Sequence, residues 1–189
     1  TPSETYVFEI GCGTGGILKY FADKGYMVSG IDLNKECINY GVSKHQLDLH
    51  CGDIHHFQPE RKIDIVICSH ILEHSCDPLA DLGRIREIMS DTGILYIEVP
   101  GVKNIHISYY SDFLIYLQNA HTLHYTKTTL NNLLSMAGYK IVKADEFIKC
   151  IALKGEKGVK ETPFNDYTET IDFLNKIEES GEKHAINFN

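Results

Sequence analysis

The stretch YVFEIGCGTGG, residues 6–16, is the strongest indication of the fold in this sequence. Its first five residues are typical of a buried strand, and glycines at positions 11, 13, 15 and 16 form the turn that follows. Glycine lets the backbone adopt positive φ and lets a ligand approach without meeting a Cβ atom. In doubly wound sheets, ligands bind beyond the carboxyl ends of such strands. The stretch therefore predicts an α/β fold with a ligand at the glycine turn.

Two cofactors fit the glycine spacing. Gly11, Gly13 and Gly16 satisfy G-x-G-x-x-G, which indicates a dinucleotide. With Gly15 in place of Gly16 the pattern is G-x-G-x-G, which indicates S-adenosylmethionine (SAM). Glu9 stands two residues before the first glycine, where a carboxylate disfavours a pyrophosphate and tolerates the ammonium group of a methionine moiety. Glu9 therefore favours SAM.

Strand and helix patterns alternate after this turn. Hydrophobic periodicity predicts strands at 6–10, 26–31, 48–51, 63–69, 94–99, 139–145 and 147–154. It predicts helices at 17–24, 35–44, 78–89 and 128–137, and a turn at 91–93. Such alternation indicates a parallel sheet covered on both faces. We therefore expect a doubly wound, seven-stranded, mostly parallel sheet with an antiparallel strand near the C-terminus.

Two segments break the alternation. Residues 102–127 form a long insertion rich in Tyr, His and Phe, and we expect it to be a substrate lid, because long loops in compact domains are usually functional. Residues 155–189 form a polar arm with one helix, expected at 168–179. Residues 1–154 are thus expected to be the ligand-binding domain. The start at Thr1 indicates a piece of a longer protein.

Two further acids follow predicted strands. Asp32 stands after the second strand, where an acid accepts hydrogen bonds from ribose hydroxyls in NAD and SAM sites alike. Asp53 follows the third strand, where it fits an adenine amine while Ile54 covers the ring. An ordinary turn residue explains Asp53 equally well.

Taken in order, these motifs resemble those of class I SAM-dependent methyltransferases. The motifs are EIGCGTG from Glu9, GID from Gly30, GDI from Gly52, DIVICSHILEH from Asp64 and HTLHY from His121. The resemblance covers about residues 6–154 and is nearest to ubiquinone/menaquinone-biosynthesis-like and small-molecule or sugar methyltransferases. Two features depart from the family: only five residues precede Tyr6, where helices are usual, and Asp-Thr-Gly at 91–93 replaces Pro-Gly-Gly.

The resemblance implies a Rossmann-like fold, SAM as cofactor, and methyl transfer to oxygen or carbon of a small-molecule or glycan-type acceptor. The residues expected to bind the cofactor are Glu9, Gly11, Cys12, Gly13, Gly15, Asp32, Leu33, Asp53, Ile54, Ser69 and His70. Two other functions stay open: a SAM-binding scaffold domain without turnover, and an NAD-dependent oxidoreductase.

The run His70-Ile71-Leu72-Glu73-His74 also matches H-x-x-E-H, an inverted zinc-protease signature. That site needs a helix through both histidines and a third ligand downstream. The run instead follows a strand directly, and a zinc protease would leave the glycine turn without a role. We therefore expect no metal. If the acceptor needs a general base, we expect His124, then His74.

Composition narrows the partners. The chain has 189 residues, a net charge of −8 and six scattered cysteines. An acidic chain without a Lys/Arg run is repelled by phosphate backbones and anionic membrane surfaces. Scattered cysteines without a CxxC pair suit a reducing compartment. We expect a cytoplasmic protein that binds neither nucleic acid nor membrane, with a neighbouring upstream domain or a homodimer as its partner.

Overall fold

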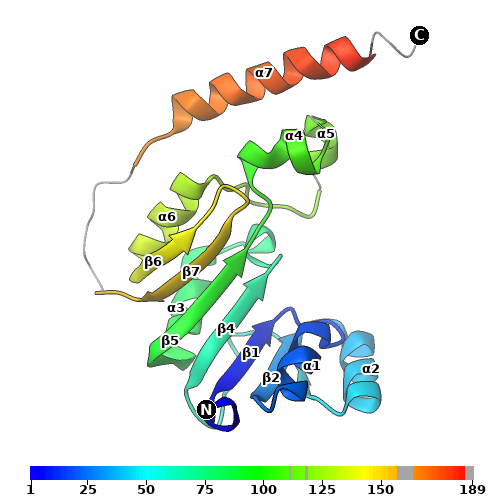
Figure 1. Ribbon diagram of the computed structural model, residues 1–189, viewed down its shortest axis with the longest axis vertical. Coiled ribbons are helices and arrows are strands. Elements are labelled where there is room, and N and C mark those ends of the chain that lie inside the picture. The colour runs from blue at the N-terminus through cyan, green and yellow to red at the C-terminus, as the bar shows by residue number, and fades with distance from the viewer. Residues whose placement is uncertain (111, 118, 157–163, 186–189) are drawn as a thin grey trace.

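The computed structural model describes residues 1–110, 112–117, 119–156 and 164–185. Its centre is a seven-stranded sheet with the order β3-β2-β1-β4-β5-β7-β6 (Figure 1). The strands are β1 (Tyr6–Ile10), β2 (Met27–Asp32), β3 (Asp48–Cys51), β4 (Ile63–Ser69), β5 (Met89–Glu98), β6 (Tyr139–Ala144) and β7 (Lys149–Lys154). Ladders among β1 to β5 are parallel, and β7 runs antiparallel to both β5 and β6. The predicted fold is confirmed.

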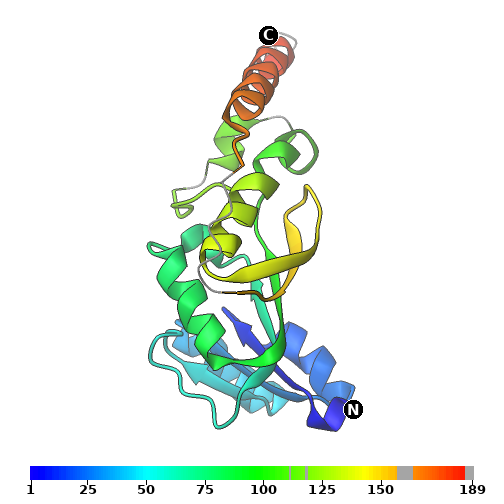
Figure 2. The same cartoon turned by 90° about the vertical axis from the view of Figure 1, so that its left-hand side faces the viewer.

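Helices cover both faces of the sheet. The longer ones beside it are α1 (Gly16–Asp23), α2 (Lys35–His45), α3 (Pro78–Ile88) and α6 (Lys127–Met136), and the 3₁₀ turns are η1 (Pro2–Glu4) and η2 (Leu72–His74). Figure 2 shows α3 and α6 on one side of the sheet and α1 on the other. The start of α3 is as the sequence predicts, since Asp77 caps it by accepting a hydrogen bond from the Ala80 amide, with proline at the first helical position.

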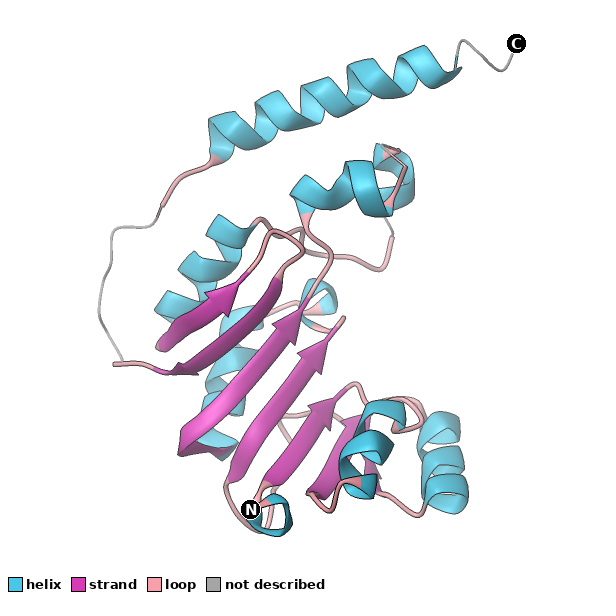
Figure 3. Cartoon of the chain, viewed as in Figure 1, coloured by secondary structure: helices cyan, strands magenta, loops and turns pink. Residues whose placement is uncertain are grey.

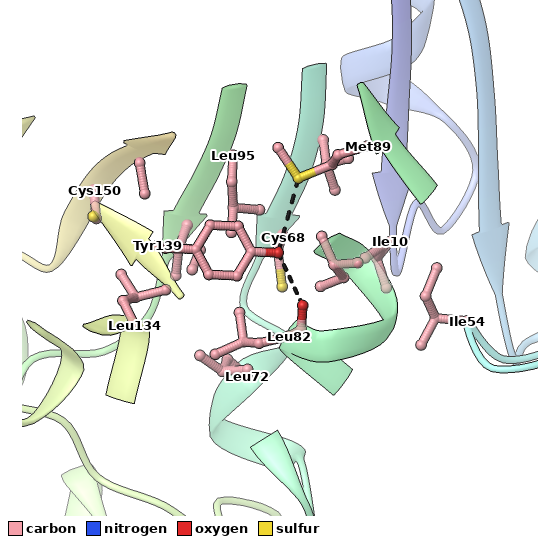
Figure 4. Packing of buried hydrophobic residues seen from close by; sticks show 14 of the residues in the cluster. Ile10, Ile54, Cys68, Leu72, Leu82, Met89, Leu95, Leu134, Tyr139 and Cys150 are labelled. Atoms are coloured by element: carbon pink, nitrogen blue, oxygen red, sulfur yellow. Dashed lines mark hydrogen bonds between the residues drawn. The ribbon is translucent and has the colours of Figure 1, made fainter. Parts of the chain in front are cut away.

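The two faces bury two separate cores because side chains alternate along each strand. On β1, Val7 packs with Leu18 and Ile38 under α1 and α2. Its neighbour Phe8 points the other way, into a larger core beneath α3 and α6. Figure 4 shows part of that larger core, where the Tyr139 hydroxyl donates a hydrogen bond of 2.9 Å to the Leu82 carbonyl. A parallel sheet buried on both faces keeps its carboxyl edge free to form a site.

The predicted turn at residues 91–93 is wrong, because these residues lie inside β5. The β4–β5 register passes from Ile63↔Met89 to Ile65↔Ile94, so the extra residues of β5 form a bulge. Gly93 suits this bulge, since a Cβ there would lie 3.0 Å from the Ser90 carbonyl oxygen. Asp91 and Thr92 are exposed on it.

The insertion and the arm pack on each other. Residues 102–127 contain η3 (Val102–Asn104), α4 (Ile105–Ser108) and α5 (Phe113–Tyr116), while α7 (Tyr167–Ala185) contains the helix predicted at 168–179. Figure 3 shows α7 running across the end of the molecule that carries α4 and α5. A third apolar cluster joins them, in which Ile105 and Tyr116 pack with Phe173 and Ile177. Among the described residues, no helix is long and apolar enough to cross a membrane.

Replacing Tyr139 by Phe is expected to lower the free energy of unfolding by about 1–2 kcal/mol, because it leaves the buried Leu82 carbonyl without this donor. Urea denaturation followed by circular dichroism measures the change. The matched control is Tyr40→Phe, at a ring that is 52% exposed. Equal stability of Tyr139→Phe and wild type would contradict this assignment.

Candidate cofactor and acceptor site

A cavity of about 400 Å³ opens at the carboxyl ends of β1, β2 and β4. Most of its wall is apolar, formed by side chains such as Ile10, Ile31, Ile54 and Ile71. Its lining also includes Gly11, Asp32, Leu33, Gly52, Asp53, His55, Cys68, Leu72, His74, Ser75, Asp81 and Ile85. An apolar cavity with a few convergent polar groups is the usual form of a small-molecule site.

The glycine turn forms one wall of this cavity. Gly11 and Cys12 donate backbone hydrogen bonds of 2.8 and 3.1 Å to the Ile31 carbonyl, which ties the turn to β2. Gly11 has a φ of +69°, and a Cβ there would lie 2.0 Å from Ile71 Cδ1. Position 11 therefore favours glycine for its backbone conformation, and a larger residue there would also displace the Ile71 side chain.

Asp32 fastens the turn from the end of β2. Its Oδ2 accepts a hydrogen bond of 2.8 Å from the Gly13 amide, and its Oδ1 accepts one of 2.7 Å from the Asn34 amide. Each carboxylate oxygen has a further lone pair, and Asp32 also lines the cavity. The Asp32 carboxylate can therefore accept hydrogen bonds from ligand hydroxyls while it also accepts them from the Gly13 and Asn34 amides.

Glu9 lies below the turn rather than on the cavity wall. Its side chain is buried, and none of the described residues donates a hydrogen bond to Oε2. Burial, with a smaller contribution from the Asp32 charge, raises the pKa of Glu9 to about 7. Nearby Cys12 is also buried, and burial raises the pKa of its thiol to about 12, so that thiol stays protonated.

Asp53 holds its own loop. Its carboxylate pairs with His56 Nδ1 at 2.7 Å and accepts a bond of 2.8 Å from the His55 amide. The His56 hydrogen bond is the main cause that lowers the pKa of Asp53. Ile54 is buried beside it, whereas Leu33 is 77% exposed. The structure thus places Asp53 both in a turn and on the cavity wall.

After β4 the chain turns sharply at His70. Its φ is +55°, unusual for a residue other than glycine, and its amide donates a bond of 2.8 Å to the Glu98 carbonyl. His70 Nδ1 lies 3.3 Å from Glu73 Oε1. Ser69 ends β4 beside Glu98 of β5. Both Ser69 and His70 lie next to the cavity without lining it.

Three histidines lead from this cavity to a second one. His74 lines the first cavity, its ring centroid is 5.0 Å from that of His121, and His121 lies 6.1 Å from His124. Burial lowers the pKa of both His121 and His124. The ring of His124 lies 4.9 Å from that of Tyr116.

The second cavity, of about 390 Å³, lies between the insertion and α7. His124, Tyr116, Phe113 and Leu174 are among its lining residues. Asp166 Oδ2 and Thr170 Oγ1 are buried, and no group in the described residues bonds to either atom. The three histidines His74, His121 and His124, called the histidine string below, thus lie between two cavities of similar size. One cavity is at the glycine turn and the other is under α7.

The structure separates the predicted site residues into groups. Those on the first cavity wall are Gly11, Asp32, Leu33, Asp53, Ile54 and His74. Those beside or beneath it are Glu9, Cys12, Gly13, Gly15, Ser69 and His70, and His124 lies on the second cavity. The sequence analysis did not identify Ile71, Asp81 or Ile85 as lining residues of this cavity. Asp81 Oδ1 lies 2.7 Å from His55 Nε2. Helical spacing from Asp77 was the available signal, since it puts Asp81 and Ile85 on one face of α3.

The matching family model and the two curated relatives compared below all describe methyltransferases. A family model described as a methyltransferase domain matches residues 1–144. The ubiquinone biosynthesis O-methyltransferase of Rhodopseudomonas palustris (strain BisB5) is 32% identical over 96 residues, which are 48% of this chain and 38% of that protein. The counterpart from Haemophilus ducreyi is 28% identical over 102 residues. The chain thus spans about two fifths of the length of these curated relatives.

Solved structures share the fold. A SAM-dependent methyltransferase from Clostridium acetobutylicum superposes with a TM-score of 0.66 at 13% identity, over 80% of this chain and 85% of that one. The plantazolicin methyltransferase BpumL, solved in complex with a triazolic desmethylPZN analog and SAH (S-adenosylhomocysteine), superposes with a TM-score of 0.64 at 18% identity, over 94% of this chain and 70% of that one. At such identities the likeness shows the fold.

Glu9 is expected to make stability fall with pH. Its pKa is about 7 in the folded protein against 4.5 unfolded, so the folded state keeps a proton that the unfolded state has lost. The free energy of unfolding should therefore decrease by about 3 kcal/mol as pH rises from 4.5 to 7, and should level off above pH 7.

Urea denaturation at a series of pH values tests this. Glu9→Gln should remove most of the decrease, whereas the exposed control Glu60→Gln should keep it. The same pH dependence in Glu9→Gln as in wild type would show that another group causes it.

Proposed function

The chain belongs to the methyltransferase-domain family of class I SAM-dependent enzymes, and we propose that it methylates a hydroxyl group of a small-molecule acceptor. The observation that carries the proposal is the cavity at the glycine turn, whose lining combines Asp32 with several isoleucines. The relatives named O-methyltransferases favour oxygen over carbon as the methylated atom. A glycan-type hydroxyl fits the same chemistry.

The residues of the cavity fit SAM. Gly11 has a positive φ that favours glycine, so the turn presents backbone without a side chain to a ligand there. The isoleucines suit an adenine ring, Asp32 suits ribose hydroxyls, and the unpartnered Glu9 Oε2 suits an ammonium group nearby. When bound, SAM supplies a methyl group on a sulfonium that a nucleophile can attack. The chain's own task is then to orient the acceptor, exclude water and accept a proton.

The acceptor side is assigned to the histidine string and the insertion at 102–127. In this proposal His124 accepts the hydroxyl proton, and His74, on the wall of the first cavity, orients the hydroxyl. Burial lowers the pKa of His124, so it is neutral and able to accept a proton at pH 7. The insertion and α7 act as the lid, since they enclose the cavity that His124 borders.

We further propose residues 1–154 as the catalytic domain and 155–189 as an arm that completes the lid. The six cysteines are free, which suits the cytoplasm, and the charge of −8 argues against nucleic acid as the substrate. A neighbouring domain or a second copy stays the expected partner.

Isothermal titration calorimetry with SAM, SAH and NAD tests the cofactor. SAM and SAH are expected to bind with one site each and NAD not at all. A folded sample that binds NAD and not SAH would overturn the proposal. The alternative is a SAM-binding scaffold without turnover, since the chain spans only about two fifths of the length of its curated relatives. Single-turnover methyl transfer from labelled SAM to a panel of hydroxylated small molecules distinguishes an enzyme from such a scaffold.

Asp32→Ala is expected to weaken SAH binding by about 100-fold, since it removes the ribose acceptor and frees the Gly13 amide. Asp23→Ala, at an exposed acid on α1 that pairs with Lys19, makes the same charge change away from the cavity and should leave affinity unchanged. Calorimetry measures both. Unchanged affinity in Asp32→Ala would mean that the cofactor lies elsewhere.

His124→Ala is expected to reduce turnover by about 100-fold or more while SAH affinity stays the same, because a general base acts on the acceptor and not on the cofactor. His50→Ala, at a histidine of β3 that lines neither cavity, is the matched control. Full turnover in His124→Ala would remove this residue as the base.

A further inference from the structure

Three potential metal ligands meet beside the first cavity. One ligand atom from each of Glu73, His74 and His121 lies within 4.8 Å of the other two. Glu73 and His74 come from η2, directly after β4, whereas His121 comes from the insertion. His121 is a ligand downstream of the H-x-x-E-H run. Glu73, and not His70, joins His74 in this group, and the run forms a 3₁₀ turn at these two residues rather than the helix that the zinc-protease signature needs.

His74 is oriented as a ligand. Its Nδ1 lies 2.8 Å from the Ala120 carbonyl oxygen, and a carbonyl only accepts, so Nδ1 carries the proton. The lone pair is then on Nε2, which lies 4.0 Å from Glu73 Oε1. A backbone carbonyl on the far nitrogen is the usual support of a metal-binding imidazole. Ligands of a tetrahedral ion lie roughly 3.4 Å apart, so a small rotation completes the site.

The cluster holds polar atoms that need a partner. Glu73 is 1% exposed, and neither its Oε2 nor His121 Nδ1 has a hydrogen-bond partner within the described ranges. Its other oxygen, Oε1, lies 3.3 Å from Nδ1 of the half-exposed His70 and 4.0 Å from His74 Nε2. A buried carboxylate is costly unless a cation or several donors compensate it. A bound cation would satisfy Glu73.

The two halves of the cluster are fastened together by backbone. The Glu73 carbonyl accepts hydrogen bonds from the amides of Thr122 and Leu123, at 2.9 and 3.2 Å. The Thr122 hydroxyl donates to the Glu73 and Ser75 carbonyls, at 3.1 and 2.8 Å. His121 is therefore held against η2 by its neighbours, which leaves its own ring free to bind.

We propose that Glu73, His74 and His121 bind one divalent transition-metal ion of the zinc class. Two imidazoles and one carboxylate suit Zn²⁺ and similar ions, whereas Mg²⁺ and Ca²⁺ prefer oxygen ligands throughout. Three protein ligands leave one coordination position open, as in catalytic zinc sites. This proposal departs from the expectation from the sequence that the chain binds no metal.

The open position is assigned to the acceptor hydroxyl, a role that rests on the proposed function. His74 lines the cofactor cavity, so the ion stands between that cavity and the insertion. A hydroxyl bound to the ion loses its proton more readily. The proton passes to His124 or water, the acceptor oxygen bonds to the methyl carbon, and the electron pair of the broken carbon–sulfur bond stays on sulfur to give neutral SAH.

Calorimetry with Zn²⁺ on chelator-treated protein tests the site. Wild type is expected to bind one equivalent, and His121→Ala at least about 100-fold more weakly, since second-shell changes alone cost 10- to 100-fold. His106→Ala, outside the cluster, should bind as wild type does. Because His121 is on a surface loop, its loss should leave the fold intact, and His74→Ala serves as a second variant. Zn²⁺ affinity that is unchanged in both variants overturns the site.

Two further titrations separate the site from its role. SAH is expected to bind His121→Ala as it binds wild type, and Zn²⁺ binding without SAH binding would overturn the proposed function while the metal site stands. Catechol, a probe with adjacent hydroxyl groups, should bind the zinc-loaded SAH complex and not the metal-free one. Equal or absent catechol binding in the two samples overturns the acceptor role alone.

Discussion

The Asp32 carboxylate is the group on which the site depends. Its two oxygens accept hydrogen bonds from the amides of Gly13 and Asn34. One side chain therefore fixes both the glycine turn and the start of α2. Asn34 then caps α2, because its Oδ1 accepts hydrogen bonds from the amides of Glu36 and Cys37. The carboxylate is thereby preorganised before any ligand arrives, and it faces the cavity with its remaining lone pairs. Removing it would disturb both the shape of the site and its charge.

A second constraint governs the acceptor side. The chain leaves β4 through the left-handed His70 and enters η2, and the loop that carries His121 is bonded back to the Glu73 carbonyl. Two segments nearly fifty residues apart thus form one unit. That unit lies between the cavity at the glycine turn and the cavity under α7. In the proposed function the first cavity holds the cofactor, and this unit borders the acceptor.

Local sequence predicted the elements well and the contacts between them poorly. Three strands, Tyr6–Ile10, Asp48–Cys51 and Ile63–Ser69, have the predicted bounds. The first and third are runs of mostly buried residues, which the local sequence pattern shows directly. The bulge in β5 was missed, since Asp-Thr-Gly suits a turn equally well and only pairing with β4 keeps it in a strand. The approach of His121 to Glu73 was also missed, because it depends on backbone bonds between distant segments. The packing of α7 on the insertion has the same long-range origin.

A crystal structure of the protein with SAH bound tests the assigned cofactor site most directly. We expect the ribose hydroxyls to bond to Asp32, the adenine to lie between Ile31 and Ile54, and the sulfur to face His74. Such a structure would also identify the walls of the acceptor pocket. SAH bound outside the cavity at the glycine turn, or with its sulfur directed away from His74 and the insertion, would show that the cofactor site is wrongly assigned.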